Sequence, residues 1–161
     1  MDTCPFMLQV IQESLRIDSP STISSGVNVT EDTVIYDKVF RSDTAIQIAN
    51  HRLHMSQKQW IEPQKFIPDR FNPSSPYFLT PEGTRRSPMS FVPFLGGKRI
   101  CVGKTFAELV AKSILPIILC QLIIDIPADS DLASDKKPTF SHFSAMPNFY
   151  VQVKERDLLL A

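Results

Sequence analysis

The sequence has little glycine, little cysteine and no net charge. Only 5 of its 161 residues are glycine, against 13 prolines. Its 17 basic residues equal its 17 acidic ones, so no strong field favours nucleic acid or an anionic membrane surface as a partner. The cysteines Cys4, Cys101 and Cys120 are odd in number, irregularly spaced and without a C-x-x-C pair. This pattern indicates reduced intracellular thiols and argues against a disulfide framework or a zinc site.

Targeting and membrane signals are also lacking. The first residues have neither the basic start nor the apolar stretch of a secretory signal, so we expect no secretory address in the chain. The most apolar segment, residues 114–126, is interrupted by Pro116, Gln121 and Asp125. It is shorter than the roughly 20 residues that a membrane-spanning helix needs. We therefore expect this segment to lie in the core of a single domain, for which the chain has an ordinary length.

The beginning of the chain has the pattern of a short amphipathic helix. Apolar residues recur at helical spacing over residues 6–15 and stop before the break at residues 19–20. Pro5 suits the first turn, and Asp2 or Thr3 suits the cap before it. The helix is therefore predicted to begin near Pro5.

The remaining pattern predicts a mainly α protein with small β-sheets, of the α+β class. β-Branched residues among turn formers over residues 23–48 indicate short hairpins. Clustered prolines and aromatics over residues 63–93 indicate an ordered but irregular coil. Apolar residues nearly encircle a helix over residues 104–122, which predicts that it is buried. Residues 138–153 are typical of two short strands that turn near residues 145–147.

The loop between the coil and the buried helix carries the candidate chemistry. Cys101 lies at the start of that helix, where unpaired N–H groups and a partial positive charge favour a thiolate. Gly97 and Gly103 lack a Cβ atom and allow a flat ligand to approach closely. Arg99 is placed to bind a carboxylate of that ligand, and Phe94 to exclude water. A shielded thiolate in this setting meets the requirements of an axial ligand to haem iron.

The same loop also suggests a phosphate-binding P-loop, because Gly97 is followed by Gly103, Lys104 and Thr105. Five residues separate the two glycines, whereas a P-loop has four. Residues 122–125, an apolar run that ends in an acid, are similar to the magnesium-binding strand of such proteins. Too little chain follows them to complete a multistranded sheet. A nucleotide-binding protein is thus a remote alternative.

Three motifs resemble one family. Residues 94–103 match the haem-binding loop of the cytochrome P450 monooxygenases, F-x-x-G-x-R-x-C-x-G, at all five fixed positions. Earlier in the chain, Glu13-Ser-Leu-Arg16 matches the E-x-x-R motif of the family's helix K. Residues 66–71 resemble its "PERF" segment, with Asp69 in place of the usual glutamate. The three motifs follow the family's order.

The resemblance implies a fold and a role for each motif residue. Residues 1–161 would form a partial P450 domain, from helix K through the haem-binding loop and the buried helix L to the terminal strands. Cys101 would be the catalytic residue and the axial ligand of the haem iron. The haem-binding residues would be Phe94, Gly97, Arg99, Cys101 and Gly103. A structural role would fall to Glu13, Arg16 and Arg70, which hold the coil beneath the haem.

The chain departs from the family in two ways. Ser25 and Gly26 stand where many members have a basic residue for a haem propionate, which leaves Arg99 as the propionate ligand. The resemblance also covers only the C-terminal third of the family's usual length. The helix with the acid–threonine pair for proton delivery, most of the substrate pocket and the membrane anchor have no counterpart here. A truncated, non-catalytic haem-binding remnant or an incomplete gene model is therefore an alternative.

For the intact protein the resemblance implies a monooxygenase. It would take electrons from an NADPH-dependent reductase or another donor and insert one atom of dioxygen into an apolar small molecule. If the intact protein resembles the eukaryotic members of the family, it would lie at the endoplasmic reticulum membrane. No nucleic acid partner is expected.

Other polar residues and loops allow more ordinary interpretations. Without Arg70, Glu13 and Arg16 would be an exposed helical ion pair. We expect the core to contain Cys4 and Cys120. The histidines share no ligand spacing and are expected to be surface or satisfied residues: His51, His54 and His142. The lysines Lys98, Lys104 and Lys112 would form either a docking patch for an acidic electron donor or an ordinary solvated face.

Residues 23–27 and 143–146 match, by position, two loops that contact substrate in the family. They could equally be part of the core.

Overall fold

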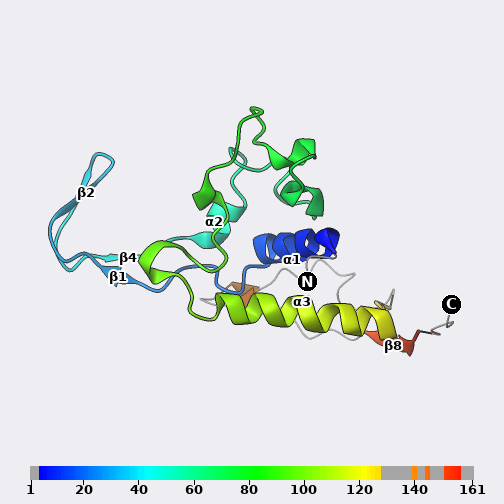
Figure 1. The fold of residues 1–161 in the computed structure, drawn as a ribbon. Coiled ribbons are helices and arrows are strands. Elements are labelled where there is room, and N and C mark those ends of the chain that lie inside the picture. Colours follow the sequence, from blue (N-terminus) through cyan, green and yellow to red (C-terminus); the bar gives the residue numbers. More distant parts are fainter. Residues whose placement is uncertain (1–3, 128–138, 141–143, 146–150, 157–161) are drawn as a thin grey trace.

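The computed structural model describes residues 4–127, 139–140, 144–145 and 151–156. Its longest helices are α1 (Pro5–Ile17) and α3 (Lys104–Gln121), which contact each other side by side. A long coil, which contains the short helix α2 (Asn50–His54), lies on the other side of α1 (Figure 1). Helix α1 therefore lies between the coil and α3, and it positions both.

Helix α1 agrees with the sequence pattern. It begins at Pro5, which is tolerated in a first turn because its missing N–H would have no partner there. Cys4 occupies the cap position without a side-chain hydrogen bond. The predicted capping residues Asp2 and Thr3 lie outside the described residues. The helix ends at Ile17, before Pro20, as predicted.

The strands form small antiparallel pairs, which confirms the expected α+β class. The pairs are β1 (Val27–Asn28) with β4 (Ala45–Ile46), β2 (Thr33–Ile35) with β3 (Lys38–Phe40), β5 (Leu122–Asp125) with β8 (Gln152–Glu155), and β6 (Thr139–Phe140) with β7 (Ser144–Ala145). The hairpins predicted over residues 23–48 are confirmed and extend away from the helices (Figure 1). The end of the chain differs from the prediction, because β8 pairs with β5 and not with a neighbouring tail strand.

The proline-rich coil is ordered by short 3₁₀ turns. These are η1 (Pro68–Phe71), η2 (Pro76–Phe78), η3 (Pro88–Ser90) and η4 (Gly97–Arg99). The first three begin with proline, whose fixed φ suits the first position of a helical turn. Ser75 and Ser87 each accept a backbone N–H of the turn that follows. The predicted ordered, irregular coil is confirmed.

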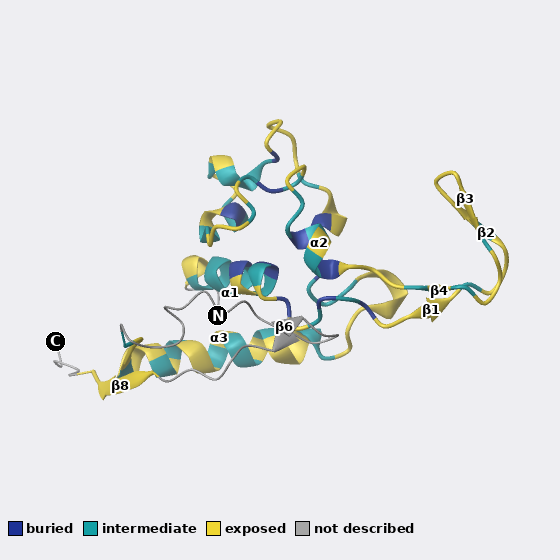
Figure 2. Ribbon diagram, turned by 180° about the vertical axis from the view of Figure 1, so that it is seen from behind, coloured by how far each residue is buried: buried dark blue, intermediate teal, exposed yellow. Residues whose placement is uncertain are grey.

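The predicted burial of α3 is wrong for this chain. No described side chain of α3 is buried, and Phe106 and Leu109 are 72% and 55% exposed. Figure 2 shows α3 in the colours of exposed and intermediate residues along its whole length. Its main packing partners among the described elements are α1 and β5, and its side chains are exposed or half-buried. The spacing of apolar residues shows that a helix is apolar on every face, but it does not show which part of the protein packs against those faces.

Two related expectations fail for the same reason. Residues 114–126, predicted to be core, are mostly exposed or half-buried. Cys4 and Cys120, also predicted to be core, are exposed.

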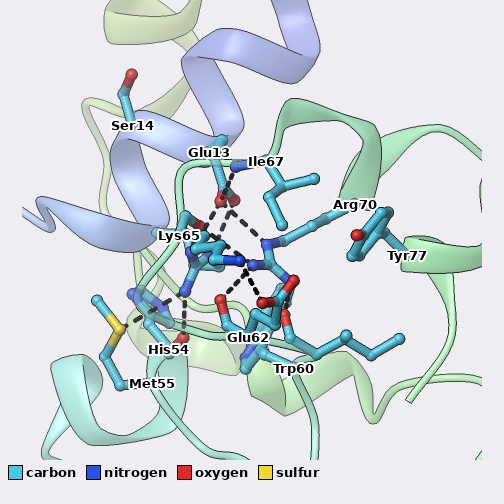
Figure 3. A network of polar contacts seen from close by, with 12 residues as sticks. Glu13, Ser14, His54, Met55, Trp60, Glu62, Lys65, Ile67, Arg70 and Tyr77 are labelled. Atoms are coloured by element: carbon cyan, nitrogen blue, oxygen red, sulfur yellow. Dashed lines mark hydrogen bonds and ion pairs between the residues drawn. The ribbon is translucent and has the colours of Figure 1, made fainter. Parts of the chain in front are cut away.

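The core is polar and lies between α1 and the coil. Within the described part of the chain, the buried hydrophobic residues are Trp60 and Val92, whereas Glu13, Arg16 and Arg70 are fully buried. The Glu13 carboxylate accepts two N–H groups of Arg16, at 2.7 and 2.8 Å, and Nε of Arg70 at 3.0 Å (Figure 3). It also accepts the backbone N–H of Ile67 at 2.8 Å. The interpretation as an exposed helical pair is therefore wrong.

The two arginines use their other N–H groups on backbone carbonyls of the coil. Arg16 donates to the carbonyl of His54 at 2.9 Å and to that of Lys65 at 3.2 Å. Arg70 donates to the carbonyls of Lys65 at 3.1 Å, Glu62 at 2.7 Å, and Ile61. Burial lowers the pKa of the Arg70 guanidinium, and its hydrogen bond to Glu13 opposes that shift. Both buried cations are thus fully hydrogen-bonded, which is the condition for keeping a charge out of water.

The ring of Trp60, in the coil, stacks against the guanidinium groups of two arginines. The guanidinium of Arg86 lies 4.3 Å from the Trp60 ring centroid, and that of Arg16 lies 5.2 Å from it. Arg86 also donates to the carbonyls of Tyr77 at 2.7 Å and Arg70 at 2.5 Å. Burial lowers the pKa of Arg86 to about 10. The Trp60 ring therefore packs against cations from both α1 and the coil.

A histidine joins the coil to the segment that precedes Cys101. His54 is fully buried, and its Nε2 accepts the backbone N–H of Val92 at 3.0 Å. Burial and, to a smaller extent, the charge of Arg16 lower the pKa of this imidazole to about 4. The interpretation of His54 as a satisfied histidine holds for Nε2, and the neutral form is the one that can accept this bond.

Replacing Glu13 by glutamine should destabilise the protein strongly. The variant keeps the shape of the side chain but leaves two buried guanidinium groups without a counter-charge, which costs about 3–5 kcal/mol. The measurement is denaturant unfolding of the full-length protein. Glu62→Gln is the matched control, because Glu62 pairs with Lys65 at the surface. Equal stability of the two variants would contradict a structural role for the Glu13 network.

The stability should also depend on the protonation of His54. Between pH 6.5 and about 4 the unfolded histidine takes up a proton while the folded one stays neutral, so stability falls as the pH is lowered through this range. We expect a loss of about 1.5 kcal/mol from this group between pH 6.5 and 5. His54→Gln should remove that contribution, so the free energy of unfolding should change less between pH 6.5 and 5 than it does in the wild type. His51→Gln, at a half-exposed site on the same helix, should change the slope less.

Candidate cofactor-binding loop

The loop around Cys101 is closed by its own backbone. The N–H of Leu95 donates to the carbonyl of Val92 at 3.0 Å, and the N–H of Cys101 donates to that of Phe94 at 2.9 Å. Gly97 has a φ of +62°, a conformation that favours glycine. Leu95 has a φ of +59°, which is strained for a residue with a side chain. This loop is therefore a defined turn that returns the chain to the start of α3.

Cys101 sits three residues before the first residue of α3, and its carbonyl accepts the N–H of Lys104 at 3.2 Å. A Cβ atom on Gly103, the cap residue of α3, would lie 3.7 Å from the sulfur of Cys101. The sulfur is thus close to the amino end of the helix, where a thiolate is favoured. The expected shielding of the thiolate is wrong within this chain, because Cys101 is exposed. No described residue covers it.

Arg99 lies in a hollow beside the loop. This hollow has a volume of about 520 Å³, and its walls include Arg99 and Leu95 on one side and residues 25–28 on the other. Among the described residues Arg99 makes no salt bridge, and its side chain is exposed. Ser25 and Gly26, which replace the family's usual basic residue, line the same hollow. The structure therefore places Arg99 beside the two residues that stand in the position of the family's basic residue.

The residues present fit a haem. An added Cβ at Gly97 would meet nothing within 4 Å, so the loop surface there is open to a flat ligand. The exposed Cys101 sulfur can supply one axial ligand, and the unpaired Arg99 guanidinium can bind an acidic side group. The part of the chain that the structure describes holds no group of three or more His, Cys, Asp or Glu that could bind a metal ion. Within the described residues, Cys101 would therefore be the residue that holds the haem iron, and Arg99 the one that binds an acidic group of the porphyrin.

Phe94 and two of the lysines line a cleft between α1 and α3. This cleft has a volume of about 490 Å³, and Phe94 lines it and not the hollow beside Arg99. Lys104 and Lys112 line the same cleft, with Glu108 between them on the helix. Lys98 is exposed on η4. The haem-contacting role of Phe94 and the docking patch of the three lysines stay predictions.

Several other candidates lie outside the site or outside the described residues. His142 and residues 143 and 146 are not described, so the second predicted substrate loop is described only as the backbone of β7. Residues 25–27 of the first predicted substrate loop line the hollow with Arg99. No helix within the described residues is long and apolar enough to span a membrane.

The sequence did not reveal the contacts of His54 and Arg86. Both make hydrogen bonds to backbone groups of residues far away in the chain. Neither lies in a spacing pattern that predicts such a partner. Trp60, the single tryptophan, was the one visible signal for this cluster.

The nucleotide-binding alternative is wrong. A P-loop connects a strand of a parallel sheet to a helix, whereas this loop follows the 3₁₀ turns of the coil. The strand β5, which suggested a magnesium site, is an antiparallel partner of β8.

Comparison with known proteins agrees with the motifs. The family model described as "Cytochrome P450" matches residues 1–152. Cytochrome P450 4F6 of Rattus norvegicus is 31% identical over 135 residues, which are 83% of this chain and 22% of that protein. Cytochrome P450 4F8 of Homo sapiens is 32% identical over 122 residues, covering 74% of this chain and 22% of the relative. The chain thus spans under a quarter of the length of these relatives.

Solved structures show the same similarity. A zebra fish cytochrome P450 with abiraterone has a TM-score of 0.77 and 25% identity, covering 95% of this chain and 33% of that one. The cytochrome P450DA heme domain has a TM-score of 0.74 and 27% identity, covering 93% of this chain and 30% of that one. The predicted C-terminal P450 architecture is confirmed, and the cofactor that it implies is haem. The chain belongs to the cytochrome P450 family.

Proposed function

We propose that the protein to which this chain belongs is a haem-thiolate monooxygenase. The observation that carries the proposal is the exposed sulfur of Cys101, held at the amino end of α3 in a loop that also presents Arg99. The family model and the relatives support the same activity class. When bound, haem supplies the iron at which dioxygen is reduced and one oxygen atom is passed to the substrate.

The residues of this chain would divide the work of holding the cofactor. Cys101 would hold the haem iron through its thiolate and would supply electron density to it. Arg99 binds a propionate, and Gly97 and Gly103 leave room for the porphyrin. Phe94 fixes the loop through its carbonyl, which accepts the Cys101 N–H. Glu13, Arg16 and Arg70 keep the supporting coil in place.

The intact protein would need partners that this chain does not contain. We propose a reductase, NADPH-dependent or of another kind, as the electron donor, and an apolar small molecule as substrate. A location at the endoplasmic reticulum membrane follows the family's eukaryotic members. We treat residues 1–161 as one partial domain, in agreement with the near-complete match to the family model.

Replacing Cys101 by serine should abolish the thiolate-type absorption band of the reduced carbonyl complex of the full-length protein. Serine keeps the size of the side chain but is not a thiolate donor. Cys120→Ser is the control, because Cys120 is also an exposed cysteine but lies in the last turn of α3, at the opposite end of the helix from Cys101. An unchanged band in Cys101→Ser would refute the assignment. A normal band in the wild type without oxygenated product would indicate a haem-binding protein that is not a catalyst.

Replacing Arg99 by glutamine should weaken retention of haem. The variant loses the charged, two-pronged donor for a propionate, and we expect roughly a 10-fold faster transfer of haem to an acceptor protein. Lys98→Gln removes one exposed positive charge next to it in the sequence and should have little effect. Equal rates for both variants would show that Arg99 contributes only its net charge.

A further inference from the structure

His54 has two connections that lead in opposite directions. Its backbone carbonyl accepts Nη1 of Arg16 at 2.9 Å, so it is held by the Glu13 network. Its ring Nε2 accepts the N–H of Val92 at 3.0 Å, and this bond is buried. The ring also packs against Phe91, with ring centroids 5.5 Å apart. One residue of α2 therefore touches both the ion-pair network and the segment that enters the Cys101 loop.

The hydrogen bonds continue from Val92 into the loop. The Val92 carbonyl accepts the N–H of Leu95 at 3.0 Å. Two residues further on, the Phe94 carbonyl accepts the N–H of Cys101 at 2.9 Å. His54 thus fixes the N–H of Val92, and the carbonyl of the same residue, in the next peptide group, makes the first of the two closures that precede Cys101.

The acceptor role fixes the form of the imidazole ring. Because Nε2 accepts a proton from Val92, the neutral ring must carry its own hydrogen on Nδ1. Nδ1 of His54 is buried, and it has no partner within the described structure. The same holds for Oδ1 of Asn50, four residues earlier on α2 and so on the same face of the helix. The bond to Val92 is thus the hydrogen bond that fixes the orientation of the ring within the described structure.

We propose that His54 is a positioning residue for the cysteine loop, which transmits the placement of the Glu13, Arg16 and Arg70 network to the Val92 peptide and hence to Cys101. The neutral ring, with its hydrogen on Nδ1, presents Nε2 to the N–H of Val92. The part of the inference that concerns the iron ligand rests on the proposed function. The part that concerns the loop backbone does not.

The test uses the full-length haem protein and His54→Leu, which removes the acceptor but keeps an apolar side chain of similar volume. We expect amide hydrogen exchange in residues 92–101 to become about 10-fold faster, the effect of one lost buried hydrogen bond. Exchange at residues 67–72, which the Glu13 network holds, should change little. The thiolate-type band of the carbonyl complex should disappear at a lower denaturant concentration than in the wild type.

Two further variants separate positioning from general stability. His54→Gln offers a side-chain carbonyl to Val92 and should restore slow exchange and the resistance of the band to denaturant. Arg52→Leu places an equally apolar residue at an exposed position of α2 and should change neither measurement. If His54→Leu does not fold, His54→Met fills the same space with only a weak acceptor and carries the same expectation.

Unchanged exchange in residues 92–101 of the apolar variant would overturn the proposal. Equal acceleration in residues 67–72 would also overturn it, because that result indicates general destabilisation. If the wild type itself shows no thiolate-type band, the proposed function fails. The exchange comparison then still decides whether His54 controls the loop backbone.

Discussion

The buried carboxylate of Glu13 is the interaction on which the rest of this structure depends. It pairs with Arg16 from its own helix and with Arg70 from the coil. The coil has almost no regular secondary structure, so its carbonyl groups lack the partners that a helix or a sheet would supply. The two arginines donate to these carbonyls at residues 54, 61, 62 and 65. A single anion thus organises the cations that in turn organise the coil.

This arrangement explains how an irregular segment can present a cysteine in a defined position. The coil is held at one end by the ion pairs and in the middle by the Trp60, Phe71 and Phe91 rings, with centroids 4.9 to 6.4 Å apart. It then passes through the closed turn that ends at Cys101. Cys101 and Arg99 are exposed, and so are many apolar side chains of α3. An exposed apolar helix beside an exposed cysteine is consistent with a chain that covers 22% of the length of its relatives.

Local patterns predicted the elements well and their surroundings poorly. Proline at the start of α1 and β-branched residues in the hairpins act within a few residues and predicted these elements. The clustered prolines predicted an ordered coil, but not the 3₁₀ turns that it contains. The burial of α3, Cys4 and Cys120 was misjudged because an apolar side chain shows a preference for a covered site and does not supply the cover. The strand β8 was predicted, but its pairing with β5 was not, since strands of this length carry little information about their partner.

The sequence by itself determined the family, through the fixed spacing around Cys101 and the two motifs that contain Glu13, Arg16 and Arg70. Spacing is sufficient there because each motif is one short piece of backbone whose geometry follows from its own residues. The resemblance also predicted that Glu13 and Arg16 act together with Arg70, and the structure has Glu13 bonded to Arg70 from 57 residues away. Only the tertiary structure decided that Arg16 and Arg70 donate to coil carbonyls and that His54 meets Val92 from 38 residues away. These bonds join a side chain to a distant segment, and such a contact leaves no periodic trace in the sequence.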